Sequence, residues 1–324
     1  MPQISAIGKY LDQPLLTAKI NKSVPAVLGV GSAVIFANSM MHTQKDERKK
    51  TGIQLGLTLL ATGLSAINAP KIAAFVTGRK PTLTVNQIKS LNSKVVDDFL
   101  NNNSVGKKIA GILEKSKENI LSLKEINVLF GNDKTKKVAQ ELIPPPDNIT
   151  SKDIFREIGW LSVYGAIPVA GGIAGGIAGD KFTDDKWKKK VPNKLKEGAY
   201  QYLANIFLCN IGAGVALGLL EKANIKSKAA RCVGMVTGIL LTGVIGGSFI
   251  ANYIGKKLIN PLVNEKSNDV RTPELLDLGL HTDDIATVSL LSGLKWIEPS
   301  LPLLYSVSGY RAGIGYRNSK DSKS

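Results

Sequence analysis

The sequence holds few of the residues on which most catalytic and metal-binding sites depend. It has two cysteines, Cys209 and Cys232, and two isolated histidines, His42 and His281, among 324 residues. A zinc site needs a cluster of such ligands, so no metal site is expected. The two lysines after Gly106 lack the upstream glycine and the hydroxyl residue of a phosphate-binding loop. No serine–histidine or paired-carboxylate arrangement occurs either. We therefore expect that the protein has no catalytic residues, binds no cofactor and is not an enzyme.

A disulfide between the two cysteines is also not expected. Both lie in uncharged stretches, at 198–220 and 232–255. If these stretches form an antiparallel hairpin, the two sulfurs are displaced by about 15 Å along the helices, at 1.5 Å per residue. A disulfide requires Cα atoms within about 7 Å of each other. The sequence therefore predicts free thiols.

Charge is missing from five long stretches of the chain. No Asp, Glu, Lys or Arg occurs in 23–44, 51–70, 158–179, 198–220 or 232–255. Each stretch is long enough to cross a hydrocarbon core of about 30 Å as a helix. The mean hydropathy of +0.04 hides this pattern because lysine-rich segments lower the average. The sequence predicts an all-α, multi-pass integral membrane protein, in the plasma membrane or, in a bacterium, the inner membrane.

The net charge of +16 is concentrated beside the apolar stretches. The polar region 81–150 has ten basic and eight acidic residues, whereas 71–80, 180–198 and 221–231 each carry a net +3. Lysine next to a membrane span indicates interfacial anchoring and contact with anionic lipid headgroups. We therefore expect the lipid bilayer as the partner, and no nucleic acid. In one orientation the loops on the inner side of the membrane carry 13 basic residues, and in the opposite orientation they carry 12. The distribution of basic residues therefore predicts no orientation.

Small residues recur four apart within the apolar stretches, most clearly in GGIAGGIAGD at 171–180. On a helix, residues with this spacing share one face, along which two backbones can approach closely. The predicted helix-packing residues are Gly29, Ala33, Ala37, Gly171, Gly175, Gly179, Gly214, Gly218, Gly243, Gly247, Ala251 and Gly255. Such faces predict a compact bundle and also suit a homo-oligomer.

The pattern divides the chain into four regions. The first region, 1–80, contains a lead-in and a first hairpin with spans at about 24–44 and 51–70. The second is an insertion at 81–156. The third, 157–257, contains three glycine-rich spans at about 158–179, 198–220 and 232–255, and the fourth is a C-terminal region at 258–324. The insertion reads as amphipathic helices outside the membrane, with capping boxes at Thr84 and Ser122. The C-terminal region contains either two interfacial helices or one broken sixth span, at 285–294 and 299–310, before a disordered tail.

Four residues are candidates for a polar path through the bundle. Lys295 and Glu298 stand three apart and can pair on one helix face. If the C-terminal segment crosses the membrane, this pair and Arg311 are intramembrane charges, which mark translocation paths. The simpler interpretation, which we favour, is an interfacial helix with its charges in water. Asn205 and Asn210 can line the same path, but such amides more commonly form hydrogen bonds between helices.

These features support two functions, with the first preferred. The abundance of packing residues and the scarcity of charge in the spans favour a structural, scaffolding or partner-binding membrane protein. The alternative is a transporter or channel for ions or small solutes, based on a weak hairpin repeat in which GVGSA at 29–33 resembles GAGVA at 212–216. With one span between them, the two hairpins have opposite orientations, as in inverted-repeat transporters. A membrane-permeabilising protein is a third, weaker hypothesis.

Overall fold

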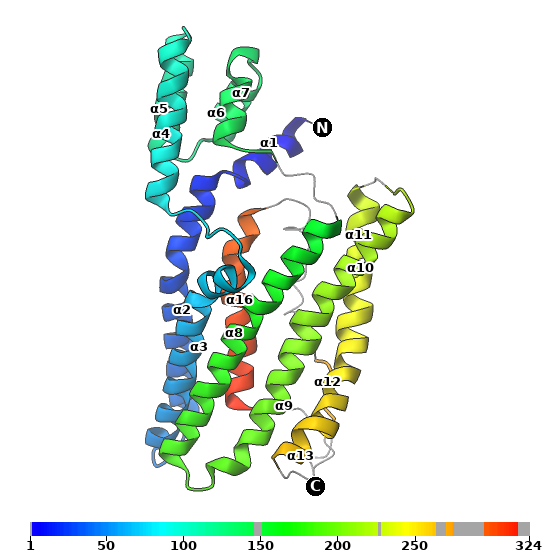
Figure 1. The fold of residues 1–324 in the computed structure, drawn as a ribbon. Helices are drawn as coiled ribbons and strands as arrows, with labels where there is room; N and C mark the ends of the chain where they lie inside the picture. Colours follow the sequence, from blue (N-terminus) through cyan, green and yellow to red (C-terminus); the bar gives the residue numbers. More distant parts are fainter. Residues whose placement is uncertain (1, 146–150, 226–227, 264–269, 275–294, 317–324) are drawn as a thin grey trace. The chain divides into compact units, whose positions relative to one another are not determined.

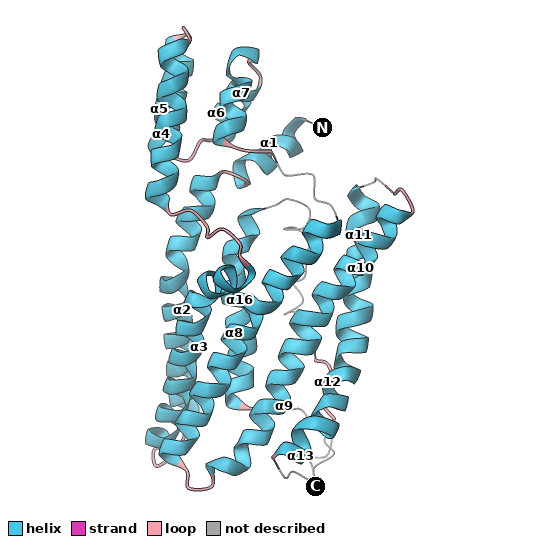
Figure 2. Cartoon of the chain, in the orientation of Figure 1, coloured by secondary structure: helices cyan, strands magenta, loops and turns pink. Residues whose placement is uncertain are grey.

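The computed structural model describes residues 2–145, 151–225, 228–263, 270–274 and 295–316. Within these ranges the regular secondary structure is helical and no β-strand occurs (Figures 1 and 2). The chain forms two compact units. The first comprises residues 1–24, 82–149 and 289–299, and the second comprises 25–81, 150–288 and 300–324.

The first unit combines the N-terminal lead-in with the polar insertion. Its helices are α1 (Pro2–Leu11), the start of α2 (Pro14–His42), α4 (Val85–Asn102), α5 (Lys107–Glu118), α6 (Leu123–Phe130) and α7 (Asp133–Leu142). The capping boxes predicted at Thr84 and Ser122 are confirmed, each with the reciprocal bonds to the third helical residue. Leu113, Ile126 and Leu129 are the centre of a small apolar core. This unit is therefore held by its own buried side chains.

A buried glutamine fastens the lead-in to the insertion. The amide nitrogen of Gln13 donates to the Leu121 carbonyl oxygen at 2.9 Å, and its amide oxygen accepts from the Leu121 N–H at 2.7 Å. Gln13 is 4% exposed, so these two bonds satisfy polar groups that water does not reach. They join residues 108 positions apart in the sequence.

The long helices lie mostly in the second unit. Among the described residues, five helical runs are long and apolar enough to cross a membrane: Pro14–His42, Arg48–Thr77, Phe155–Thr183, Trp187–Lys222 and Val233–Leu262. They correspond to the five stretches predicted from the absence of charge. The second and third runs are α3 (Arg48–Thr77) and α8 (Ser151–Thr183), which pack along each other. Figure 1 shows the long helices of this unit running side by side as a bundle.

The fourth and fifth runs contain π-helical segments. The fourth comprises η1 (Trp187–Lys190), α9 (Val191–Tyr202), η2 (Leu203–Phe207) and α10 (Leu208–Lys222). The fifth lies in α11 (Lys228–Ile239), η3 (Leu240–Gly247), α12 (Ser248–Ile254), η4 (Gly255–Ile259) and α13 (Asn260–Leu262). A π segment interrupts the regular ladder of backbone bonds. Here the Cys209 thiol donates to the Ala204 carbonyl and the Thr242 hydroxyl to the Leu208 carbonyl, both at 2.8 Å.

The C-terminal helix α16 (Leu301–Ile314) packs against α3, α8 and α9. It follows a short 3-10 helix, η5 (Lys295–Ser300). Its 14 residues span about 21 Å, less than the hydrocarbon thickness of a bilayer. The 299–310 stretch is thus mainly a helix that packs within the second unit, with eight buried residues in α16. The predicted 285–294 helix lies outside the described residues.

One glycine face of α8 lies against α3. A Cβ atom added to Gly175 would stand 2.5 Å from the Leu57 carbonyl oxygen, and one added to Gly179 would stand 2.7 Å from the Gln54 Cα. At Gly171 it would meet the side chain of Ser65 at 2.1 Å. Any larger residue at these positions would have to push the two helices apart.

The opposite offset pair of α8 glycines lies against α16. A Cβ atom at Gly172 would be 1.9 Å from the Gly309 carbonyl oxygen, and one at Gly176 would be 1.9 Å from the Gly313 carbonyl oxygen. In both cases the obstructing atom is backbone, which cannot rotate away. The helix α8 is therefore in backbone contact with two neighbours.

The other predicted packing residues fall into two groups. Those that are buried in the second unit are Gly214, Gly243, Gly247, Ala251 and Gly255. Those with an exposed surface, or with no neighbouring atom within 4 Å of an added Cβ, are Gly29, Ala33, Ala37 and Gly218. In the second group, an added Cβ at Gly29 or Gly218 meets no atom within 4 Å, and Ala33 and Ala37 are exposed.

Candidate functional site

Ionisable side chains are buried in the second unit, near the end of the bundle where α8 leads into α9. Those at 5% exposure or less are Asp180, Lys194, Lys196, Glu197, Arg271 and Arg311. Removing a charge from water is costly unless the group is paired and hydrogen-bonded. The partners of these groups therefore decide what the cluster can do.

Glu197 is the centre of a buried network. The Arg271 guanidinium donates to its carboxylate at 2.8 Å, Gln201 donates to it at 2.7 Å, and an Arg311 nitrogen lies 3.8 Å away. Arg311 also donates to Glu274 at 3.2 Å. We call these five residues the Glu197 network. Its two acidic and two basic side chains balance, which makes deep burial tolerable.

The network holds the 270–274 segment against the helices. The Arg271 guanidinium lies 3.8 Å from the centre of the Tyr200 ring, a cation–π contact. Asn252 donates its amide to the Arg271 carbonyl at 2.9 Å and accepts from the Arg271 N–H at 3.0 Å. Arg271 itself is 1% exposed. This arginine therefore connects α9, α12 and the segment after α13.

A ladder of polar side chains continues from Glu197 along the fourth helical run. Asn205 donates to the Gln201 side-chain oxygen at 3.0 Å, so Glu197, Gln201 and Asn205 are linked at intervals of four residues. Asn210 is 1% exposed, and its side-chain oxygen has no hydrogen-bond partner among the described residues. The predicted residues Asn205 and Asn210 are both buried. The described bond of Asn205 runs along its own helical run rather than to another helix.

The other predicted pair, Lys295 and Glu298, lies in the first compact unit. Glu298 is 9% exposed and groups with the first unit, whereas Arg311 belongs to the second. Lys295 starts η5, and its side chain lies outside the described residues. Of the predicted charges, Arg311 joins the Glu197 network.

A second charge cluster surrounds Asp180, at the end of α8. The Lys194 ammonium is 3.0 Å from one oxygen of Asp180 and donates to the Gly313 carbonyl oxygen at 2.6 Å. Gln54 donates to the other oxygen of Asp180 at 2.9 Å, and the Lys190 ammonium lies 3.6 Å from that oxygen. Asp180 thus joins α3, α8 and the start of α9.

Asp184 extends this cluster into the connection between α8 and η1. The Lys190 ammonium lies 2.9 Å from its carboxylate and the Lys50 ammonium 3.7 Å away. The hydrogen bond with Lys190, helped by the Lys186 N–H, lowers the pKa of Asp184 to about 2. Asp184 is therefore ionised at neutral pH. Three lysines and two aspartates give the cluster a net charge of +1.

The Asp180 cluster borders a pocket of about 390 Å³. We call it the Asp180 pocket; its polar lining includes Thr51, Gln54, Asp180, Lys190, Lys194 and Tyr310. These residues come from α3, α8, η1, α9 and α16, so the close packing of α8 places them together. The volume lies in the range of small-molecule binding sites.

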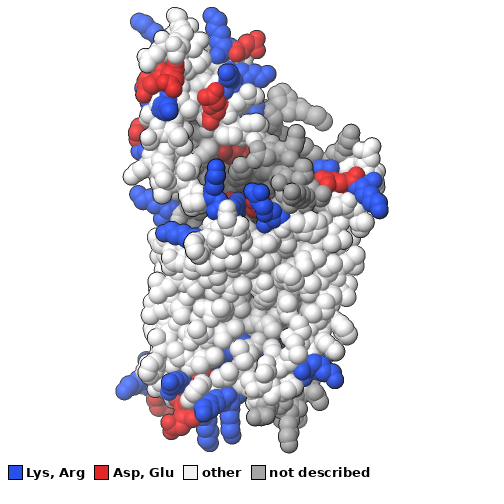
Figure 3. Space-filling view, in the orientation of Figure 1, with Lys and Arg blue, Asp and Glu red and all other residues white. Residues whose placement is uncertain are grey.

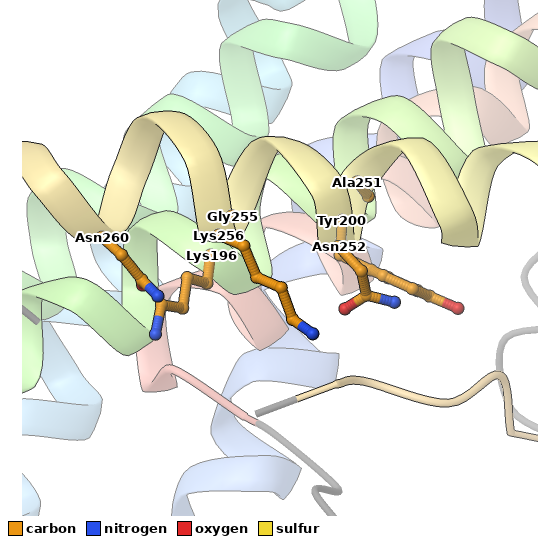
Figure 4. A pocket seen from close by; sticks show the side chains of 7 residues that line it. All are labelled: Lys196, Tyr200, Ala251, Asn252, Gly255, Lys256 and Asn260. Carbon is orange, nitrogen blue, oxygen red and sulfur yellow. The ribbon is translucent and has the colours of Figure 1, made fainter. Parts of the chain in front are cut away.

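A much smaller cavity lies beside the Glu197 network, between α9 and the α12–α13 region (Figure 4). The side chains of Lys196 and Asn260 point toward each other there, and those of Tyr200 and Asn252 lie farther along. Its volume of about 10 Å³ is enough for about one water molecule. This cavity is too small for a solute.

Charge is distributed unevenly over the face shown in Figure 3. The surface of the long helices is almost free of Lys, Arg, Asp and Glu along its middle, and charged side chains gather toward the ends. Large apolar side chains are exposed on these helices, among them Phe75 at 89%, Phe249 at 74% and Leu262 at 82%. On this face, the middle of the bundle therefore presents an apolar surface.

The sequence interpretation missed most of this site because it treated 180–198 as an interfacial lysine-rich segment. One signal was available. Lys190, Lys194, Glu197 and Gln201 follow one another at spacings of four, three and four, which places them on one helix face that leads to Asn205. Nothing in the local sequence marks Arg271.

Comparisons with family models, with curated proteins and with solved structures found no match for this chain.

Proposed function

We propose that the chain is a multi-pass integral membrane protein in which the five long helices are embedded in the lipid bilayer. The apolar side chains exposed on these helices support this, because a soluble monomer rarely exposes so large a continuous apolar surface. The test is extraction of membranes at alkaline pH, which releases peripheral proteins. We expect the protein to stay in the membrane pellet and to be released by detergent; release at alkaline pH alone would contradict the proposal.

Close helix packing through glycine holds this bundle together. The faces of α8 toward α3 and α16 support the proposal, since lipid offers no hydrophobic driving force between helices and van der Waals contact must replace it. The tight contacts surround α8, whose C-terminal end carries Asp180. The close packing of α8 therefore also positions Asp180 in the pocket.

The activity that the site supports best is the binding and transport of a small polar solute. The observation that carries this proposal is the Asp180 pocket, lined by a buried ion pair at one end of a bundle with an apolar exterior. Ionisable residues inside a membrane domain are costly and are usually retained for function. The ladder from Glu197 to Asn205 continues the buried polar side chains along the fourth helical run beyond Lys194, and a transport path would use such a row.

Flux through reconstituted protein tests this proposal. Purified protein is placed in proteoliposomes, and uptake of radiolabelled amino acids, hydroxy acids and sugars is compared with that of protein-free vesicles. We expect uptake of at least one class, with loss of uptake in Asn205→Leu and in Lys194→Gln. Protein that is folded and inserted but gives no uptake above empty vesicles would contradict transport.

A scaffolding role is the second candidate, supported by the small-residue face of α2. Gly29, Ala33 and Ala37 are exposed along one side of this helix, which suits contact with another helix in the membrane. A cysteine at Ala33, in protein without Cys209 and Cys232, tests this by crosslinking in native membranes. Efficient crosslinking together with no flux would favour the scaffold over the transporter.

A further inference from the structure

We infer that the Asp180 pocket binds a small organic anion that carries one carboxylate and at least one hydroxyl group. This inference rests on the proposed function and names its solute class. It is carried by the charge, the hydrogen-bond donors and the size of the pocket.

The charge of the cluster favours a monoanion. Among the described residues, Lys50, Lys190 and Lys194 face Asp180 and Asp184 within ion-pair distance, so three positive charges meet two negative ones. Lys194 is 5% exposed and is paired with Asp180, so the excess positive charge lies on the more exposed side chains of Lys50 and Lys190 at the rim. A bound carboxylate would bring the cluster to neutrality, whereas a cationic solute would add to the excess.

A donor is available for that carboxylate. An ammonium group has three N–H donors. Lys194 donates one of them to the Gly313 carbonyl oxygen, and its ammonium forms an ion pair with Asp180 at 3.0 Å. A further N–H can reach a ligand in the pocket that Lys194 lines. Lys190, at the rim and 41% exposed in its side chain, can approach the same ligand.

Helix dipoles do not decide the sign of the ligand here. The first turns of α3 and α9 and the last turns of α8 and α16 all reach the pocket, through Thr51, Asn193, Asp180 and Gly313. Their positive and negative ends offset each other. The side-chain charges therefore determine the preference.

The rest of the lining fits hydroxyl groups. Thr51, Thr58 and Tyr310 contribute hydroxyls, and the Thr58 hydroxyl donates to the Gln54 carbonyl oxygen, which leaves its own oxygen as an acceptor. A pocket of about 390 Å³ suits a small solute rather than a lipid or peptide. A short hydroxycarboxylate matches the size, the charge and the hydrogen bonds together.

The test measures binding of glycerate and of glycerol to the full chain in detergent by titration calorimetry. Both probes have three carbons, but only glycerate carries a carboxylate. We expect glycerate to bind at least tenfold more tightly than glycerol. Lys190→Gln and Lys194→Gln should each weaken glycerate binding at least tenfold, whereas Lys189→Gln, in the same exposed segment but outside the pocket, should leave it unchanged.

Two outcomes overturn the inference: equal binding of glycerol and glycerate, or unchanged glycerate binding in Lys190→Gln. If Lys194→Gln fails to fold because Gly313 loses its partner, Lys190→Gln carries the test alone. Flux measurements separate this inference from the proposed function. Glycerate binding without any solute flux refutes transport only, and flux of a solute that is insensitive to Lys190→Gln refutes the anion site only.

Discussion

Replacing Glu197 by methionine should strongly destabilise the second unit. The change keeps the side-chain volume similar but removes the carboxylate that faces Arg271, and both side chains are 0% exposed. Arg271 would keep contacts such as the cation–π contact with Tyr200 and a backbone carbonyl at 3.3 Å, but it would lose the Glu197 carboxylate. Removing one partner of a buried ion pair costs about 3–5 kcal/mol, because the remaining charge stays buried without that compensation.

The matched double variant separates this cause from lost packing. With Glu197→Met and Arg271→Met together, both members of the central ion pair are gone, although Gln201 and Arg311 lose an acceptor. We therefore expect the double variant to be clearly more stable than either single variant. An additive result would mean that the two side chains do not act as a pair.

The buried thiol of Cys209 provides the assay, in protein with Cys232 replaced by serine. Cys209 is 0% exposed, so it reacts with a fluorescent thiol reagent only when the bundle opens. Heating in detergent then gives an apparent melting temperature. A loss of about 3–5 kcal/mol corresponds to a decrease of at least about 5 °C in a chain of this size. A decrease of less than about 1 °C in Glu197→Met would refute the argument.

Three further predictions address other contacts. Gly176→Ala should lower the same melting temperature by the equivalent of about 1–3 kcal/mol because its Cβ meets backbone, whereas Gly29→Ala should not lower it. The pKa of Asp184 is lowered to about 2 from 3.8. The ionised carboxylate of Asp184 therefore stabilises the fold above about pH 4, and this contribution is lost as the pH falls toward 2. The difference in melting temperature between wild type and Asp184→Asn should follow this course, and a difference that is constant with pH would contradict it. Gln13→Ala should leave the backbone of Leu121 unsatisfied at a cost of about 1–3 kcal/mol, measured as faster hydrogen exchange in the 119–122 segment; unchanged exchange would argue against the bond.

Some of the site was accessible from the sequence. Asn205 and Asn210 were identified as polar residues within an apolar stretch, and both are buried. The fourth helical run, however, starts at Trp187 rather than near residue 198, so Lys194 and Glu197 belong to it. The charge-based boundary excluded them, because a rule that ends spans at charged residues cannot recognise charges that are buried and paired.

The sequence by itself determined the helices. Three sequence features can be recognised without knowing the fold: a stretch of about 20 uncharged residues, a capping box, and small residues at every fourth position. Each depends only on residues within a few helical turns of one another. Only the tertiary structure decided which faces meet and which charges pair. Glu197, Arg271 and Arg311 are separated by 74 and 40 residues, and the oxygen that accepts from Lys194 belongs to Gly313, 119 residues away. Such pairing depends on the packing of α9 against α16 and α12, and no local pattern encodes the distance between residues that far apart in the chain.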